Sequence, residues 1–251
     1  MAKTDMVYGL HTVQALFERH PERILELQVL QGRADERLSA IIAMAYQHGI
    51  SMQHRDRHQL DQLVEGGNHQ GVVARVRESV PGGDNELWAL LDELSEPPFL
   101  LILDNITDPH NLGACLRSAD GAGVHAVIAP RDKAAGLTPV ARKVASGAAE
   151  VLPFFQVTNL ARVLKELRER GVWLVGTDLD ATAKPIYACD LTGPLAIVMG
   201  AEGTGMRRLT RENCDGLAYI PMAGSVDSLN VAVATGVTLF EARRQRLAAK
   251  K

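Results

Sequence analysis

Cysteine, aromatic residues and long apolar runs are all scarce in this sequence of 251 residues. Its three cysteines, Cys115, Cys189 and Cys214, are far apart and form no CxxC pair, which argues against a disulfide framework and a zinc site. Aromatics make up only 4%, so the core must consist mainly of leucine, valine, isoleucine and alanine. No run approaches the roughly 18 apolar residues of a membrane span, and the charged N-terminus is not a signal peptide. We therefore expect a cytoplasmic globular protein with no membrane segment.

Several functional classes lack their sequence signature here. The net charge is −3 and the pI is about 6.2, so a partner rich in phosphate would have to be met by local basic patches. The sequence has no Walker GK[ST], no GxSxG of a serine hydrolase and no GxGxxG after its first strand. Its eight histidines show no metal-ligand spacing such as HExxH, and no metal is expected.

The sequence pattern divides near Pro81. Before it, helical candidates at 15–20, 35–49 and 56–67 alternate with strand candidates at 23–32, 50–54 and 71–76, and Asp56 is a candidate N-cap. The stretch "RESVPGGDNE" (77–86) has turn formers and no periodicity, so it predicts a linker to which Gly82 and Gly83 give little stiffness. We expect domains at 1–80 and 99–251, joined by a linker and connecting helix at 81–98.

Apolar runs alternate with helical segments after the linker. The strand candidates lie at 99–104, 124–130, 151–157, 172–178, 195–200 and 217–222, with helical candidates that include 138–149 and 159–171. Strands that are apolar throughout and separated by helices predict a parallel sheet covered on both faces. Ligands of such sheets bind outside the carboxyl ends of the strands. The residues that follow each strand are therefore the candidates for a site.

Polar or glycine-rich residues follow three of these strands. The segments are "DNITDPHNLGACLR" (104–117), "IVMGAEGTGMRR" (197–208) and "YIPMAGSVDSLNVAVATG" (219–236). Each has a structural interpretation too: the glycines suit turns, "GSVDSLN" suits a helix N-cap, and Arg117 suits a solvated helix face. Spacing alone predicts a ligand site at the carboxyl edge of the sheet and nothing more specific.

Taken together, the three segments resemble the motifs of the SPOUT class of S-adenosylmethionine-dependent methyltransferases. Within that class they are similar to the tRNA/rRNA ribose 2′-O-methyltransferase family. Asn111 and Arg117 match the first motif, "MGAEGTG" (199–205) matches the second, and Ser228 with Asn230, after the "IP" that ends a strand, match the third. The resemblance covers about residues 100–246, and residues 1–80 resemble the small L30-like domain that precedes the catalytic domain in several members.

The resemblance implies a fold and a set of functional residues. The expected fold is α/β: a parallel-sheet SPOUT domain whose C-terminal segment forms a deep trefoil knot, preceded by a small L30-like α/β RNA-binding domain. The implied donor is S-adenosyl-L-methionine, and the implied assembly is a homodimer. The implied catalytic positions are Asn111, Arg117, Glu202, Ser228 and Asn230, and the implied donor-binding positions are Gly200, Ile220 and Leu229.

Elementary chemistry suggests a role for each polar position. A ribose hydroxyl must lose its proton and be aligned with the donor's methyl group. Arg117 suits the neighbouring phosphate, because a guanidinium donates in a rigid fork and stays charged at neutral pH. Glu202 is expected to hold its loop by accepting backbone N–H bonds, whereas Ser228 and Asn230 are expected to orient the hydroxyl or Arg117. Glycine at position 200 would leave room for the donor.

The function implied by the resemblance is 2′-O-methylation of a guanosine in 23S rRNA, in the loop that holds the acceptor end of peptidyl-site tRNA. RNA contact would use the basic clusters at 54–58, 206–211 and 242–251. Two alternatives are 2′-O-methylation of tRNA and a non-catalytic RNA-binding ribosome assembly factor, which would have little reason to keep all five polar positions. Whether the substrate is free rRNA or a ribosomal precursor stays open, as does whether Arg117 serves its own site or its partner's.

Overall fold

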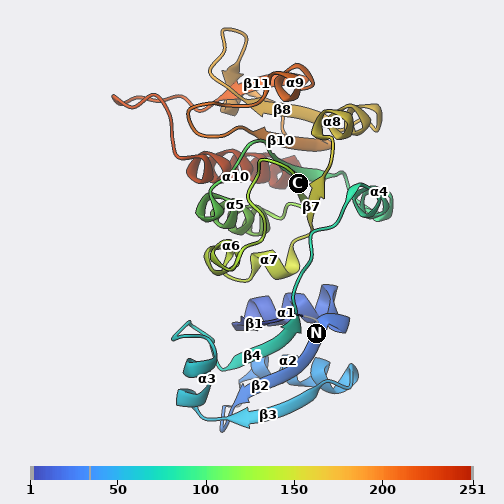
Figure 1. Cartoon of the computed structure of the whole chain (residues 1–251), viewed down its shortest axis with the longest axis vertical. Helices are drawn as coiled ribbons and strands as arrows, with labels where there is room; N and C mark the ends of the chain where they lie inside the picture. The colour runs from blue at the N-terminus through green and yellow to red at the C-terminus, as the bar shows by residue number, and fades with distance from the viewer. Residues whose placement is uncertain (1–2, 34, 250–251) are drawn as a thin grey trace. The chain divides into compact units, whose positions relative to one another are not determined.

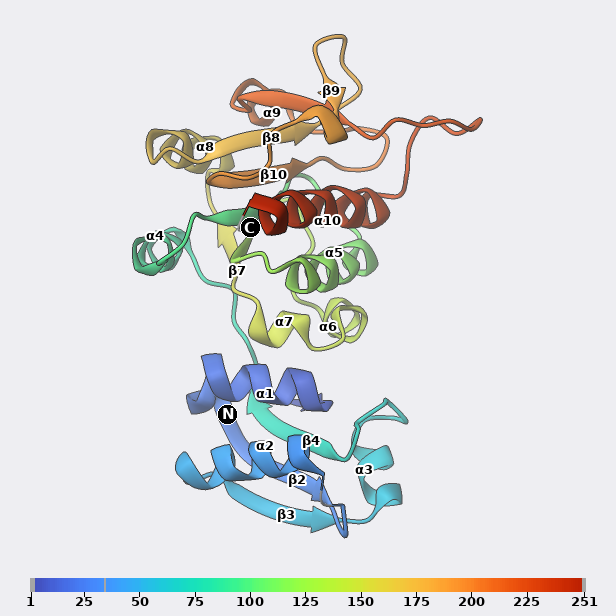
Figure 2. The same cartoon turned by 180° about the vertical axis from the view of Figure 1, so that it is seen from behind.

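The computed structural model describes residues 3–33 and 35–249. Met1–Val80 and Pro81–Lys251 form two compact units, each with its own sheet. Figures 1 and 2 show the chain from opposite sides.

The first unit is built on a mixed sheet. Its elements are β1 (Thr4–Tyr8), α1 (Leu10–Arg19), β2 (Ile24–Leu30), α2 (Glu36–Gln47), β3 (Ser51–Arg55), α3 (Arg57–Leu63) and β4 (Val72–Arg77). The strand order is β1-β4-β2-β3, in which β2 pairs in parallel with β3 and antiparallel with β4. The predicted α/β pattern is confirmed, although the prediction omits β1. That edge strand buries only Val7 and so has little apolar signal.

Side-chain caps determine where two of these helices begin. The Asp56 carboxylate accepts the Gln59 N–H at 2.8 Å, and the Gln59 side chain accepts the Asp56 N–H at 3.1 Å, which closes a capping box at the start of α3. Asp35 caps α2 by accepting the Leu38 N–H at 3.2 Å. The predicted N-cap at Asp56 is therefore confirmed.

The second unit contains a parallel sheet of seven strands among the described residues. The strands are β5 (Phe99–Leu103), β6 (Ala126–Pro130), β7 (Phe154–Val157), β8 (Trp173–Thr177), β9 (Lys184–Pro185), β10 (Leu195–Met199) and β11 (Gly216–Tyr219). Their order is β7-β6-β5-β10-β8-β11-β9, and all the pairs are parallel. The predicted parallel sheet is confirmed, and only the short edge strand β9 has no counterpart in the prediction.

Helices cover both faces of this sheet. They are α4 (Asp84–Glu93), α5 (Pro109–Ala122), α6 (Pro139–Ala145), α7 (Ala148–Val151), α8 (Leu160–Glu169), α9 (Arg208–Glu212) and α10 (Val231–Ala249). The helices α5, α6, α7 and α10 share one apolar core, and α4 and α8 pack into the core on the opposite face (Figures 1 and 2). In β5, Phe99 and Leu101 point to the first core and Leu100 and Ile102 to the second. This double burial is why the strands are apolar throughout.

The connection between the units is shorter than predicted. Gly82 pairs with β7: its N–H donates to the Phe154 carbonyl at 2.9 Å, and its carbonyl accepts the Gln156 N–H at 2.9 Å. A Cβ at this position would lie 2.6 Å from the Phe155 ring, and α4 begins two residues later, at Asp84. The flexibility predicted for Gly82 is therefore wrong, because close packing holds this glycine against the sheet.

The predicted helix at 138–149 is two helices. Ser146 and Gly147, with φ of 51° and 90°, adopt left-handed backbone conformations that end α6 and precede α7. A buried ion pair between Arg142 of α6 and Glu150 of α7 joins the two pieces. Ser146, at this break, lies beside α5, because its Oγ accepts a bond from Arg117 of that helix at 3.4 Å.

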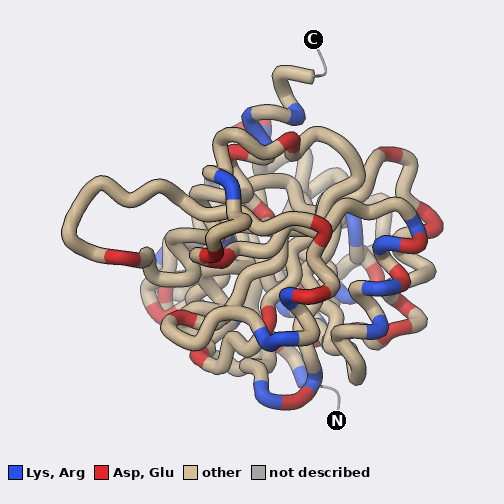
Figure 3. The backbone as a smooth tube through the Cα atoms, turned by 90° about the horizontal axis from the view of Figure 1, so that it is seen from above, with Lys and Arg blue, Asp and Glu red and all other residues tan. Residues whose placement is uncertain are grey.

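Basic and acidic positions are interleaved along the chain (Figure 3). In the C-terminal cluster at 242–251, Arg244 pairs with Glu241 at 2.8 Å. Arg246 donates to the Gly193 carbonyl at 2.6 Å and to the Pro97 carbonyl at 2.8 Å. Arg246 thereby holds α10 to its own domain, and the expectation that this cluster contacts RNA stays a prediction. Lys250 and Lys251 lie outside the described residues, and the predicted trefoil knot stays a prediction.

Gly113 allows α5 and α6 to pack closely. A Cβ at Gly113 would lie 2.4 Å from the Ala141 carbonyl oxygen, so the α6 backbone would have to move. We expect Gly113→Ala to lower the free energy of unfolding by about 1–3 kcal/mol, the usual cost of overpacking. Gly121→Ala is the control on the same helix, since its nearest atom would be 3.6 Å away on Phe240. It should be neutral or stabilising by up to about 1 kcal/mol, because alanine favours helix. Urea unfolding measures both, and equal effects would contradict the packing argument.

Candidate active site

The first two predicted segments begin side by side. Strands β5 and β10 are neighbours, with Leu103 opposite Met199, and the Asp104 N–H donates to the Met199 carbonyl at 2.8 Å. The third segment follows β11, which lies two strands further along the same parallel sheet. Because parallel strands end at a common edge, all three segments start from the carboxyl edge where a ligand is expected.

A buried carboxylate connects the first segment to the second. Asp104 is fully buried, and its Oδ2 accepts the backbone N–H of Arg207 at 2.7 Å. Its Oδ1 lies 2.8 Å from Nε of the same arginine, in an ion pair rather than an in-line hydrogen bond. Sequence reasoning did not select Asp104 as a site residue. The available signal was an acid placed directly after an apolar strand.

The loop after β10 closes on its own backbone. Ala201 N–H donates to the Gly205 carbonyl at 3.1 Å, and Gly205 N–H donates to the Ala201 carbonyl at 2.8 Å. A Cβ at Gly200 would lie 2.3 Å from the Gly205 carbonyl carbon and from the Met206 nitrogen. The expectation that glycine is needed here to make room for the donor is incomplete, because the loop itself requires it.

Asn230 brings the three segments together. Its Nδ2 donates to Oδ1 of Asn111 at 3.0 Å and approaches Oε2 of Glu202 at 3.3 Å. Its Oδ1 accepts the Ala232 N–H at 3.0 Å, which caps the first turn of α10. These contacts fix the orientation of the Asn230 amide, with its nitrogen toward Asn111 and Glu202 and its oxygen toward the start of α10. Asn230 is thus a connector between segments, and Glu202 accepts a side-chain amide rather than the backbone N–H bonds predicted for it.

Arg117 lies outside this network in the described chain. Its Nη1 donates to Oγ of Ser146 at 3.4 Å, at the break between α6 and α7. Ser228 is exposed and lies on the wall of the cleft described next. The structure therefore brings together Asn111, Glu202 and Asn230, and the expected contact between Asn230 and Arg117 is absent among the described residues.

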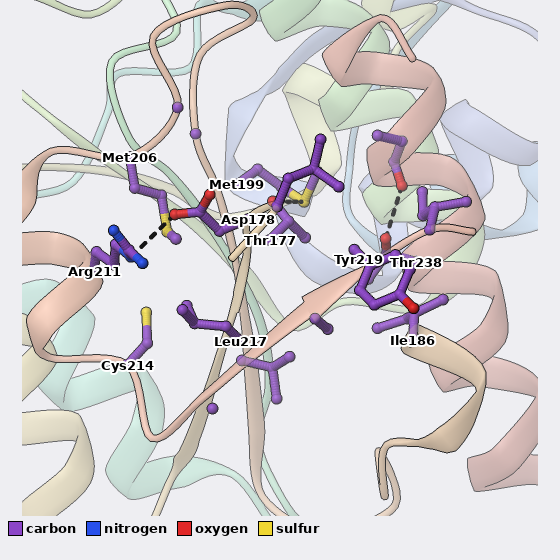
Figure 4. A pocket seen from close by; sticks show the side chains of 18 of the residues that line it. Thr177, Asp178, Ile186, Met199, Met206, Arg211, Cys214, Leu217, Tyr219 and Thr238 are labelled. Atoms are coloured by element: carbon purple, nitrogen blue, oxygen red, sulfur yellow. Dashed lines mark hydrogen bonds and ion pairs between the residues drawn. The ribbon is translucent and has the colours of Figure 1, made fainter. Parts of the chain in front are cut away.

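A cleft of about 1510 Å³ lies beside these loops. The predicted donor-binding residues Gly200, Ile220 and Leu229 line it, together with Glu202 and Ser228. Figure 4 shows labelled lining residues on both sides of the strands, with Met206, Arg211 and Cys214 on one side and Ile186, Tyr219 and Thr238 on the other. The lining combines apolar side chains with polar and charged ones, as a site for a small organic ligand requires.

Neighbouring groups determine the state of Arg211 and Cys214 in the cleft. Arg211 pairs with Asp178 at 3.1 Å and also with Asp180 (Figure 4 draws the first pair). Burial, helped by the nearby carboxylate of Asp215, raises the pKa of the Cys214 thiol to about 12, so this thiol is protonated at neutral pH and does not act as a nucleophile. Across the described ranges, no group of three or more His, Cys, Asp or Glu side chains is placed to hold a metal ion.

The fold and the three meeting segments define an RNA ribose methyltransferase class, and a family comparison gives the same result. The SpoU rRNA methylase family model matches residues 98–240, and the chain belongs to this family. A second model, described as RNA 2′-O ribose methyltransferase substrate binding, matches residues 6–81. The SPOUT-type α/β fold is thereby established for the chain.

Relatives with a named activity are similar over nearly the whole length. The chain is 60% identical to the 23S rRNA (guanosine-2′-O-)-methyltransferase RlmB of Yersinia pestis over 243 aligned residues. This alignment covers 97% of this chain and 98% of the relative. It is 55% identical over 251 residues to RlmB of Pseudomonas syringae, with 100% of both chains covered. Among solved structures, the SpoU methyltransferase AviRb of Streptomyces viridochromogenes, in complex with AdoMet, has a TM-score of 0.70 at 25% identity and covers 98% of this chain and 91% of its own.

No helix in the described part of the chain has the length and apolarity needed to cross a membrane.

The Asp104 carboxylate is expected to stabilise the fold. Asp104→Asn removes the charge that faces the Arg207 guanidinium and weakens the hydrogen bond that the Arg207 backbone N–H donates. The free energy of unfolding should therefore fall by about 1–3 kcal/mol. Asp132→Asn, at an exposed position after β6, is the control and should stay within about 0.5 kcal/mol of the wild type. Urea unfolding at low and high salt measures both. A wild-type midpoint for Asp104→Asn would contradict the role given to this carboxylate.

Proposed function

We propose that this protein transfers a methyl group from S-adenosylmethionine to the ribose 2′-hydroxyl of a guanosine in 23S rRNA. The observation that carries this proposal is the 60% identity to an enzyme named for that reaction over 97% of this chain and 98% of the enzyme. The juxtaposition of Asn111, Glu202 and Asn230 supports it, because a purely structural RNA-binding protein would not need these three polar groups at one point. No observation favours tRNA as the substrate.

The cleft suits the methyl donor. Ile220 and Leu229 offer half-buried apolar side chains against which an adenosine can pack, and the bare backbone at Gly200 allows close approach. When bound, the donor supplies an electrophilic methyl group on a sulfonium. Residues of the cleft then have to hold the donor in one orientation and keep water from the methyl group.

The polar network is assigned to alignment of the acceptor. Asn230 fixes the Asn111 carbonyl oxygen, which leaves the Asn111 N–H groups available in the described chain for a ribose or phosphate oxygen. Glu202 keeps its second carboxylate oxygen for a hydroxyl proton or an N–H donor. Ser228, exposed on the cleft wall, is assigned to the acceptor hydroxyl.

Arg117 is assigned to the phosphate beside the target ribose. A guanidinium matches phosphate with two parallel N–H donors and remains charged at neutral pH, so positioning suits it better than proton removal. Ser146 accepts one of its N–H groups and thereby limits the orientations of the side chain. The catalytic set thus comprises Asn111, Arg117, Glu202, Ser228 and Asn230.

We assign RNA recognition to residues 1–80, connection to residues 81–98, and donor binding and transfer to residues 99–251. The substrate-binding model supports the first assignment and the methylase model the last. A protein that acts on ribosomal RNA is expected to work in the cytoplasm.

We further propose a homodimer that forms through α10. Val233, Phe240 and Leu247 are 53%, 51% and 49% exposed, and their spacing of seven residues places them along one side of the helix. Such a stripe of large apolar side chains is typical of an interface. Because Asn230 caps the same helix, the proposed interface adjoins the catalytic network.

The substrate assignment is tested by offering unmodified 23S rRNA and unmodified tRNA to the purified protein with methyl-labelled S-adenosylmethionine. We expect label in 23S rRNA, at the 2′-oxygen of one guanosine, located by resistance of the adjacent bond to alkaline hydrolysis. Label in tRNA alone would overturn the substrate, and no label in either RNA would favour a non-catalytic binding protein.

Arg117→Ala should leave the affinity for S-adenosylhomocysteine unchanged and reduce turnover on rRNA by at least about 100-fold, as expected for loss of a positioned catalytic group. Ser146→Ala should have a smaller effect, because it removes only a partner of that arginine. Calorimetry and single-turnover methylation measure the two quantities. Lys165→Ala, on the exposed face of α8, is the control and should behave as wild type. Near-normal turnover by Arg117→Ala would remove this residue from the mechanism.

A further inference from the structure

The first unit contains a second cleft, of about 670 Å³, that the proposed methyl transfer does not use. Arginines from three places in the fold line it: Arg33 after β2, Arg37 on α2 and Arg57 at the start of α3. Its other wall is the loop "GGNHQG" (66–71) before β4. Convergence of separate elements on one cleft distinguishes this group from arginines scattered over a solvated face.

The carboxylates of this cleft are already satisfied within the unit. Asp35 pairs with Arg33 and accepts the Leu38 N–H at 3.2 Å, and Asp61 lies 3.1 Å from Nε2 of His69. Among the described residues, neither Arg37 nor Arg57 has an ion pair, and both side chains are exposed. The cleft therefore offers a ligand two guanidinium groups that have no ion-pair partner in the described chain, and its three arginines outnumber its two aspartates.

The loop wall is held in one conformation. His69 is 6% exposed, and its Nδ1 accepts the Gly71 N–H at 2.9 Å, which leaves the Nε2 proton for Asp61. The Gln70 side chain accepts the Leu10 N–H at 3.1 Å, and the Gln70 carbonyl accepts a bond from Arg33 at 2.7 Å. Gln70 has a φ of 49°, a left-handed conformation that these contacts sustain. A wall restrained in this way loses little entropy when a ligand binds.

The chemistry of the lining selects among ligands. Paired arginines suit phosphate groups, and Asn68, which also lines the cleft, carries a side-chain amide that can add a neutral donor. Phe, Tyr and Trp are missing from the described lining, and the His69 imidazole is buried and bonded to Gly71 and Asp61, so the cleft provides no open platform on which a base can stack. These features suit a sugar–phosphate backbone better than a base.

We infer that this cleft binds phosphates of an unpaired segment of the substrate RNA and so positions the target for the second unit. The inference rests on the proposed function, because that function identifies RNA as the substrate. Contacts to phosphate set register and affinity without reading sequence. Arg37 and Arg57 are thus positioning residues for the reaction, and the cleft contributes nothing to donor binding.

The test compares two double variants of the full-length chain. Arg37→Ala with Arg57→Ala removes the cleft charges, and Lys3→Ala with Arg19→Ala removes two exposed charges elsewhere in the same unit. Binding to a single-stranded rRNA fragment is measured at several salt concentrations. Two lost phosphate contacts should reduce the slope of log affinity against log salt by about 1.4, since each phosphate on a single strand contributes roughly 0.7. The cleft variant should also raise KM for rRNA at least about tenfold, with kcat and S-adenosylhomocysteine affinity unchanged.

Conservative replacement provides a second measurement. Arg37→Lys with Arg57→Lys keeps both charges and should retain most of the slope, although lysine lacks the forked geometry. An alanine double variant with the slope and KM of the control variant would overturn the inference. Binding of inorganic phosphate that is lost in the alanine variant, together with unchanged RNA affinity, would identify a free-anion site and overturn it too. Failure of the proposed function has a different signature, because the wild type would then bind the fragment without methylating it.

Discussion

The arrangement of the site depends on one buried carboxylate. Asp104 stands at the end of β5 with no exposure to solvent, and its oxygens hold the backbone N–H and the guanidinium of Arg207. A charge in this position is tolerated only because it is paired and hydrogen-bonded. The pair locates the far end of the loop that follows β10. Gly200, around which the loop closes, lies in the segment between β10 and Arg207. Glu202, which approaches Asn230, lies in the same segment.

Asn230 performs two tasks with one amide group. Its oxygen caps α10, and its nitrogen joins Asn111 to Glu202. A shift of α10 would therefore move the polar network as well. In the homodimer proposed above, contacts along the exposed apolar stripe of this helix would restrain Asn230, the residue that connects the segments.

The net charge of −3 does not indicate which basic side chains are engaged within the protein and which are available to a ligand. Arg246, in the most basic run of the sequence, donates to backbone carbonyls of its own domain, and Arg211 is paired with acids in the cleft of the second unit. Arg37 and Arg57, by contrast, are separated by many residues in the sequence yet line one cleft. The basic run at 54–58 thus included Arg57, whereas no local run of basic residues indicated Arg37.

Much of the fold was predictable from the sequence, because strands buried on both faces are apolar at every position. Runs such as that around Leu101 therefore indicated a parallel sheet with a site at its carboxyl edge, and the three motifs indicated the family. Sequence alone did not reveal the role of Asp104, the reason for glycine at position 200, or the connecting role of Asn230, because each depends on atoms that are distant in the chain. Periodicity and local composition determined which elements form. Only the tertiary structure decided which polar groups meet, because hydrogen bonds form between neighbours in space rather than in sequence.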